Sequence, residues 1–186
     1  DHVVKAEILL HGSFATTGIG HGTDKALIAG LLGMRPDDIR IPDSFFLAKK
    51  DGMEFSFSTI TLKDAHPNTA VLRLTGEHGR KIEVQAASIG GGRILIAKLD
   101  GIEVNFSAEK PTLIVHNVDQ PGHVAQVTSM LAEKQVNIAT LQLYRDKRGG
   151  YAVMVIETDQ EVPEESVVWL EQLDGIIKVT YINEEE

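Results

Sequence analysis

The order of strand-like and helix-like segments between residues 112 and 182 constrains this chain more than any other feature. Short β-branched or alternating runs predict four strands, and apolar residues at helical spacing predict two helices. A proline suits the first position of a helix because it has no N–H to leave unpaired. In chain order the expected elements are a strand at Thr112–His116, a helix that opens at Pro121, strands at Val136–Leu143 and Tyr151–Glu157, a helix at Ser166–Leu173 and a strand at Ile176–Ile182.

The resulting order, βαββαβ, is that of the ferredoxin-like arrangement. In this arrangement two helices cover one face of a four-stranded antiparallel sheet. The sequence therefore predicts a compact ferredoxin-like domain for residues 111–186.

The sequence pattern of residues 1–110 predicts a mixed α/β domain. Val3–Leu10 alternates as a strand does, Gly12–Gly22 is expected to be a loop, and Thr23 or Asp24 can cap a helix that ends at Gly33. Composition changes near residues 107–111, so the fold class predicted for the whole chain is α+β, with domains at 1–110 and 111–186. The remaining elements expected in the first domain are a short helix at Pro42–Lys50 and strands at Phe55–Leu62, Ala70–Thr75, Lys81–Ile89, Arg93–Leu99 and Glu103–Phe106.

Charge and cysteine content exclude several functions. The chain has 18 Lys and Arg against 27 Asp and Glu, a net charge of −9, which argues against general affinity for nucleic acid or anionic membranes. It has no cysteine, which excludes a disulfide scaffold, a cysteine-ligated zinc site and a self-contained iron–sulfur cluster. No run of about 18 apolar residues occurs, so no membrane span is expected. The expected location is the reducing cytoplasm, which the absence of cysteine permits.

The glycine-rich stretch from His11 to Asp24 is the densest candidate for ligand binding. Glycines let the backbone approach a ligand closely, and the amides at a helix start favour an anion such as a carboxylate or phosphate. The alternative is a glycine-rich turn that carries two helix caps. The glycine spacing is not the dinucleotide-binding fingerprint, and Ser13 lacks the nucleophile-elbow pattern.

The stretch Asp64–Thr69 is the second candidate. His66 can act as a base or a hydrogen-bond donor near neutral pH, and Asn68 can hold a carboxylate or a hydroxyl. The alternative is a plain turn, because Asp, Pro and Asn are turn formers. His21 and His66 could together ligate a metal, but the spacing indicates no third ligand, so no metal site is predicted.

Two further stretches carry polar or glycine-rich turns. Ser88–Arg93 contains three glycines, which indicate either close backbone approach or a hairpin turn. Asn117–Gly122 leads from a strand into a helix, where amides can take a carboxylate while Asp119 or Asn137 takes an ammonium or hydroxyl group. A free amino acid fits that chemistry, and the alternative is a turn that only starts the helix.

These stretches resemble the beta subunits of bacterial iron–sulfur-dependent L-serine dehydratases. Residues 1–110 resemble the allosteric substrate binding (ASB) domain, which also occurs in some D-3-phosphoglycerate dehydrogenases, and residues 112–183 resemble an ACT domain. The stretches that carry the resemblance are Gly12–Ala15, Gly20–Leu27, Arg40–Asp43, His66–Thr69, Ser88–Gly92, Asp119–Gly122 and Val136–Ala139.

The resemblance implies a lyase subunit that is inactive alone and deaminates L-serine to pyruvate and ammonia with a partner. It implies a [4Fe-4S] cluster that acts as Lewis acid on the hydroxyl leaving group and is held by cysteines of a separate alpha subunit, in a heterodimer or larger assembly. A Gly-Pro-Ser-Ser-Ser-His-Thr-like segment belongs to the family's pocket, and no such motif occurs in this sequence. By motif position, the implied roles are catalytic for His21, Asp24, His66 and Asn68, and substrate-binding for Ser13, Gly22 and Thr23.

In the ACT part, the resemblance implies a regulatory ligand site at Asn117, Asp119 and Asn137, and a homodimer through paired ACT domains. Asp119 stands where asparagine is more usual, and its charge disfavours a ligand carboxylate. Two alternatives stay open. The chain could be the ASB–ACT regulatory module of a phosphoglycerate dehydrogenase, which requires a fused dinucleotide-binding domain, or a stand-alone amino-acid sensor.

Overall fold

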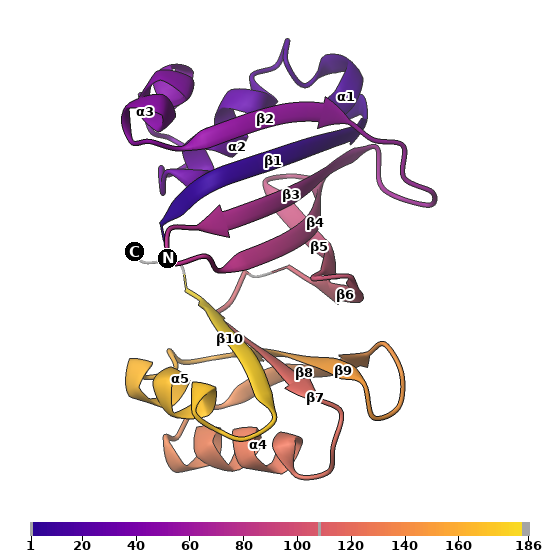
Figure 1. Cartoon of the computed structure of the whole chain (residues 1–186), viewed down its shortest axis with the longest axis vertical. Helices are drawn as coiled ribbons and strands as arrows, with labels where there is room; N and C mark the ends of the chain where they lie inside the picture. Colours follow the sequence, from indigo (N-terminus) through magenta and orange to yellow (C-terminus); the bar gives the residue numbers. More distant parts are fainter. Residues whose placement is uncertain (1, 108, 184–186) are drawn as a thin grey trace. The chain divides into compact units, whose positions relative to one another are not determined.

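The computed structural model describes residues 2–107 and 109–183 (Figure 1). Its internal contacts divide the chain into two units, Asp1–Gly101 and Ile102–Glu186. Both units combine strands with helices, which confirms the predicted α+β class. The domain boundary expected at residue 110 stays a prediction.

The first sheet has the strand order β2-β1-β3-β4-β5-β6. β2 runs parallel to β1, whereas the pairs β1–β3, β3–β4 and β4–β5 are antiparallel. The elements up to β6 are β1 (Val3–Gly12), α1 (Ser13–Thr17), α2 (Thr23–Leu31), the 3-10 turn η1 (Ile41–Asp43), α3 (Ser44–Lys50), β2 (Glu54–Thr59), β3 (Asn68–Gly76), β4 (Lys81–Gly90), β5 (Arg93–Leu99) and β6 (Ile102–Phe106).

Three helices cover one face of this sheet. Ile8 of β1 lies opposite Phe57 of β2 and Leu72 of β3, so the three strands present one apolar face. Ile28 of α2 and Ala48 of α3 pack fully buried into the same cluster, and α2 and α3 lie along β1 and β2 in Figure 1. Alternation along β1 therefore fixes which face the helices cover.

The second unit confirms the predicted βαββαβ order. Its four-stranded antiparallel sheet has the order β10-β7-β9-β8, and α4 and α5 pack on the face that carries Val115, Met154 and Val179. Its elements after β6 are β7 (Thr112–Val118), α4 (His123–Glu133), β8 (Ile138–Arg145), β9 (Tyr151–Thr158), α5 (Glu164–Glu171) and β10 (Ile176–Ile182).

Three local expectations are wrong. The expected loop after β1 contains the short helix α1, because its hydrogen bonds close within Ser13–Gly18. The N-cap of α2 is Gly22, and no side chain caps that helix, so neither Thr23 nor Asp24 does so. Pro121 precedes α4 rather than opening it, since Gly122 adopts a φ of 110° and serves as the N-cap.

Among the described residues, no helix has the length and apolar character needed to cross a bilayer.

Candidate functional site

The end of β1 and the start of β3 bring two of the candidate motifs together. Gly12 pairs with Asn68 in the antiparallel register, and the N–H of Phe14 donates to the carbonyl oxygen of Pro67 at 3.5 Å. Ser13 lies between these two contacts and is exposed. The Ser13 and His66–Asn68 motifs, more than 50 residues apart in sequence, thus share one end of the sheet.

Gly12 makes this approach possible. Its φ is +57°, and a Cβ at this position would lie 2.5 Å from the Pro67 carbonyl oxygen and 2.8 Å from the Pro67 Cα. Both the backbone conformation and the space therefore require glycine.

His66 is held in one orientation by its own turn. Its Nδ1 accepts the backbone N–H of Asn68 at 3.1 Å, and its carbonyl oxygen accepts the hydroxyl of Thr69 at 2.6 Å. Because Nδ1 is the acceptor, the neutral ring carries its proton on Nε2. The ring is exposed, so Nε2–H is available to a ligand.

The turn between α1 and α2 fixes the second group of candidates. The N–H of His21 donates to the carbonyls of Thr17 and Gly18, and the N–H of Thr23 donates to the Gly18 carbonyl at 2.8 Å. Gly22 has a φ of +75° and ends the turn. The His21 side chain is exposed, while the backbone around it is tied down.

Asp24 occupies the first turn of α2 and is 8% exposed. Its Oδ1 has no hydrogen-bond partner among the described residues. A buried carboxylate oxygen without a hydrogen-bond partner is energetically costly.

Two supporting residues were not predicted. The buried hydroxyl of Ser44 donates to the Lys25 carbonyl at 2.9 Å, which ties the start of α3 to the turn that holds Asp24. His11 accepts the N–H of Leu62 at 3.1 Å and so anchors the loop that leads to His66. A serine at a helix start predicts only a cap, so no sequence signal could have found the first contact.

The third candidate stretch forms a hairpin turn between β4 and β5. Gly90, Gly91 and Gly92 all have positive φ values, and the space beside each is open within 4 Å. Turn geometry alone accounts for these glycines.

In the second unit, the end of β7 and the turn after it hold two of the three regulatory candidates, Asn117 and Asp119. Asn117 is 3% exposed; its amide donates to the Val118 carbonyl at 2.7 Å, and its Oδ1 has no partner in the described part of the chain. Asp119 accepts the N–H of Gly149 at 2.9 Å and the guanidinium of Arg145 at 3.0 Å. These two bonds, the Gly149 bond foremost, hold the pKa of Asp119 below its usual value.

Asn137, the third regulatory candidate, lies elsewhere. Its amide donates to Asp159 at 2.6 Å. Asn117 pairs with Ala152 on β9, whereas Ile138, which follows Asn137, pairs with Thr158. Six residues of extended strand separate the two positions by about 20 Å. One copy of the chain therefore does not bring the three candidates into one pocket.

The chain is similar to several known proteins. The family model "Serine dehydratase beta chain" matches residues 1–50, and the "ACT domain" model matches residues 111–167. The L-serine dehydratase beta chain of Peptoniphilus asaccharolyticus is 38% identical over 161 residues, 86% of this chain and 72% of that protein. The probable L-serine dehydratase beta chain of Bacillus subtilis is 37% identical over 175 residues, 94% of this chain and 79% of that protein.

A more distant similarity is to D-3-phosphoglycerate dehydrogenase of Methanocaldococcus jannaschii. It is 31% identical over 112 residues, which cover 60% of this chain but 21% of that protein. The match therefore involves one part of a much longer enzyme. The identity, coverage and family matches together assign the chain to the family of L-serine dehydratase beta chains, with an ACT domain in its C-terminal part.

Proposed function

We propose that this chain is the pocket-completing subunit of an L-serine dehydratase and is inactive alone. Its relatives are named beta chains, which supports a second, alpha chain as partner. The proposal rests on one observation. The Ser13 motif and the His66–Asn68 motif lie side by side where Gly12 of β1 pairs with Asn68 of β3. Together they supply exposed polar groups of the kinds that a small zwitterion with a hydroxyl group requires.

The substrate carboxylate suits the start of α2. The helix is nine residues long and has no side-chain cap, so its first amides and its positive end favour an anion. Gly22 lets a ligand approach closely, and Thr23 offers a hydroxyl donor beside it, while Ser13 offers one at the end of β1. Asp24, with its unpartnered oxygen, suits the substrate ammonium group.

His66 and Asn68 suit the reacting end of serine. The Nε2–H of His66 is the free donor of a ring whose Nδ1 is already engaged, so it can donate to a hydroxyl or carboxylate oxygen. Asn68 offers both an amide donor and an acceptor. His21 is a second imidazole, held on a rigid turn, for proton transfer.

The residues of this chain do not fit an iron–sulfur site. It has no cysteine, and the described residues contain no group of three or more His, Asp or Glu that could hold a metal. We propose that the [4Fe-4S] cluster is held by the alpha chain, where it would supply Lewis acidity toward the hydroxyl leaving group. The role of the present residues is to bind and orient the substrate and to move protons.

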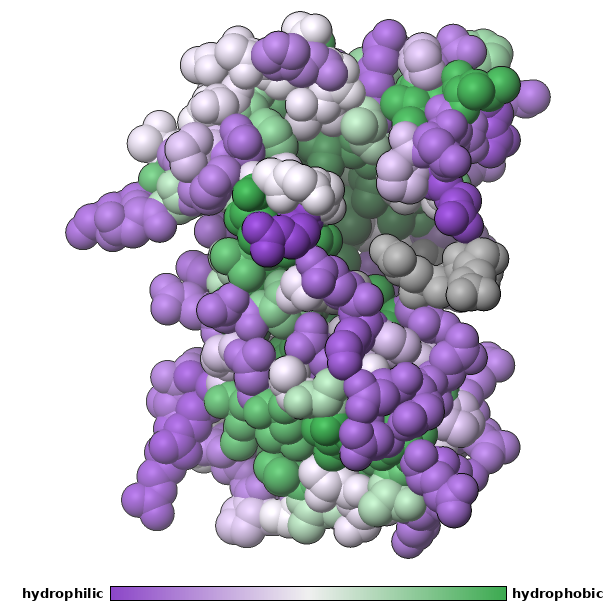
Figure 2. Space-filling view, turned by 180° about the vertical axis from the view of Figure 1, so that it is seen from behind, coloured by the Kyte–Doolittle hydropathy of each residue, from purple (hydrophilic) through white to green (hydrophobic). Residues whose placement is uncertain are grey.

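For regulation, we propose an ACT homodimer. Asn117 and Asp119 of one copy and Asn137 of a second copy would form each amino-acid site, since a single copy keeps them about 20 Å apart. β8 is an edge strand, and Leu141 and Leu143 on it are exposed. Hydrophobic side chains also gather on the surface of this unit in Figure 2. An exposed apolar edge strand favours pairing with another chain.

The decisive experiment joins the full-length beta chain with the alpha chain under anaerobic conditions. We expect pyruvate from L-serine for the mixture and none for either chain alone. Activity of the beta chain alone, or none from the loaded complex, contradicts the proposal.

The dimer is tested separately by light scattering. Leu143→Lys on the edge strand is expected to halve the measured mass of the isolated beta chain. Lys63→Leu, which changes the net charge in the opposite direction, is the control.

A further inference from the structure

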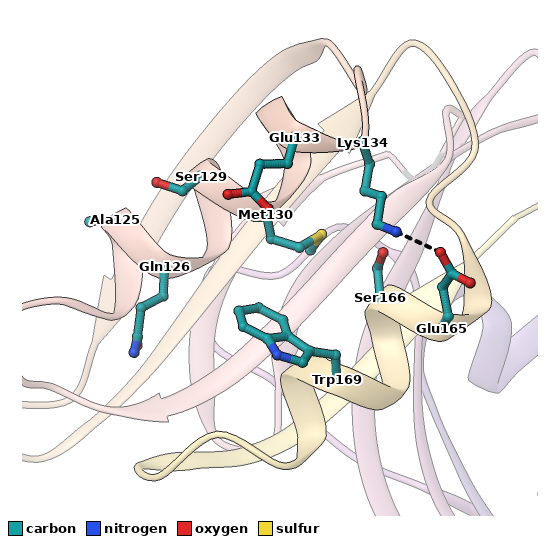
Figure 3. A pocket seen from close by; sticks show the side chains of 9 residues that line it. All are labelled: Ala125, Gln126, Ser129, Met130, Glu133, Lys134, Glu165, Ser166 and Trp169. Carbon is teal, nitrogen blue, oxygen red and sulfur yellow. Dashed lines mark hydrogen bonds and ion pairs between the residues drawn. The ribbon is translucent and has the colours of Figure 1, made fainter.

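The helical face of the second unit carries a groove between α4 and α5 that the proposed function does not use. It has a volume of about 610 Å³ (Figure 3). Its lining residues are Ala125, Gln126, Ser129, Met130, Glu133 and Lys134 of α4 and the turn after it, and Glu165, Ser166 and Trp169 of α5.

The walls of the groove suit a flat or extended apolar stem. Trp169 is 42% exposed, and its indole lies across the groove from α4 in Figure 3. Met130, 6% exposed, forms the floor. Ala125 and Ser129 are four residues apart on α4, so these small side chains lie on one face and leave room opposite the indole.

The charges around the groove suit a cation. Lys134 is the only cation among the lining residues, and its Nζ lies 2.5 Å from Glu165 Oε1. Glu133 has no ion pair or side-chain hydrogen bond within the described ranges. The lining of the groove therefore includes one carboxylate without a paired cation and one exposed indole, and both attract a positive group.

A buried hydroxyl adds a second indication. Ser166 is 2% exposed, and its Oγ has no hydrogen-bond partner among residues 2–107 and 109–183. In Figure 3 this oxygen points into the groove below the Lys134–Glu165 pair. A donor brought into the groove would satisfy this oxygen, and a buried polar atom left without a partner is costly.

We propose that the α4–α5 groove binds an organic cation, an ammonium or guanidinium group on an apolar stem. The stem would lie between Trp169 and Met130, and the positive group would reach the Glu133 carboxylate. The ligand we propose is a free basic amino acid or amine, for which a groove of about 610 Å³ has room. A Lys or Arg side chain of the partner chain in the groove is the outcome that would overturn this assignment. The proposal does not depend on the serine chemistry of the first unit.

Trp169 is the only tryptophan of the chain, so its fluorescence reports directly on the groove. The full beta chain is titrated with N-acetyl-arginine amide, with the neutral N-acetyl-norleucine amide and with N-acetyl-glutamate amide. We expect a saturable change with the arginine probe and at least about threefold weaker binding of the neutral one. Glu133→Gln should weaken binding of the arginine probe by about three- to tenfold, and added salt should weaken this binding to a similar extent.

Glu77→Gln, a carboxylate in an exposed turn of the first unit, is the matched control and should bind the arginine probe as the unaltered chain does. Equal binding of the neutral and cationic probes, no saturable change, or full binding by the Glu133→Gln chain overturns the proposal.

The two sources are distinguished in the complex with the alpha chain. The beta chain is labelled with 5-fluorotryptophan, which gives a single fluorine resonance from Trp169. If the alpha chain supplies the cation, complex formation shifts this resonance and excludes the arginine probe. If the ligand is free, the probe binds the complex as it binds the beta chain.

Discussion

The Nδ1 of His66 accepts the backbone N–H of Asn68 at 3.1 Å, so two residues of the candidate pocket hold each other in place. The bond leaves Nε2–H as the free donor of the neutral ring. It also separates the two ring nitrogens: Nδ1 maintains the turn, and Nε2 is left for the substrate contact proposed above.

Substituting His66 tests this division. His66→Asn keeps an acceptor that can take the Asn68 N–H but removes Nε2, because a short amide forms the same local turn. We expect kcat for L-serine to fall about 100-fold or more in the reconstituted enzyme, with unfolding unchanged. His66→Ala should lose the same activity and, in addition, about 1 kcal/mol of stability from the broken bond. Steady-state kinetics near the original values in His66→Asn would remove Nε2 from the mechanism.

Asp24→Asn is expected to separate binding from stability. The substitution removes a largely buried charge with an unpartnered oxygen, so thermal unfolding of the chain should stay the same or shift upward. Loss of the carboxylate should raise the KM for L-serine about tenfold or more, because a charged partner of the ammonium is gone. Calorimetry and initial rates provide the two measurements. A clear drop in melting temperature with unchanged KM would assign Asp24 a structural role instead.

Gly12→Ala is expected to disrupt the pocket through the backbone. The new Cβ would lie 2.5 Å from the Pro67 carbonyl oxygen in a residue with a φ of +57°. We expect a loss of about 3 kcal/mol or more in the free energy of unfolding, from strain and clash together. Gly33→Ala is the matched control, since Gly33 also has a positive φ but open space around it, and it should lose about 1–2 kcal/mol. Chemical denaturation followed by circular dichroism measures both, and equal losses would mean that the contact with Pro67 is unimportant.

The Asp119 turn predicts a pH dependence of stability. The Gly149 N–H and then Arg145 hold the folded-state pKa of Asp119 below its value in the unfolded chain. A depressed pKa contributes stability that is present above the unfolded pKa, about 4, and is lost as pH falls through the folded value. Asp119→Asn should therefore be less stable than the unaltered chain at pH 7, and the difference should shrink below about pH 4.

Urea unfolding followed by Trp169 fluorescence measures this effect, because the tryptophan lies in the same unit. Asp174→Asn removes an exposed carboxylate of that unit and is the control for a simple change of net charge. A difference between Asp119→Asn and the unaltered chain that persists unchanged at pH 3 would contradict the role of the charge.

Sequence patterns predicted most elements because those elements depend on local periodicity. The alternation in β1 and the β-branched run of β7 were sufficient to predict both strands, and β10 was predicted with its observed bounds. Helix starts were predicted less well. Gly22 forms the N-cap of α2 in place of Thr23 or Asp24, and α4 begins after Gly122 and not at Pro121. The turns before the two helices place both glycines at positive φ values. Caps depend on backbone geometry that residue type alone does not specify.

In the candidate pocket, too, some features follow from the sequence and others only from the tertiary structure. The motifs around Ser13 and His66 carry residue types suited to a small zwitterion, and the sequence by itself determined those types, the absence of cysteine and the two-part order of elements. Only the tertiary structure decided that Gly12 pairs with Asn68 and that Ser44 holds the turn beside Asp24, because both contacts depend on strand register and helix packing. Register also separated Asn117 from Asn137. A strand pattern predicts which face a residue occupies, but the distance between two residues along a sheet depends on the pairing of distant strands.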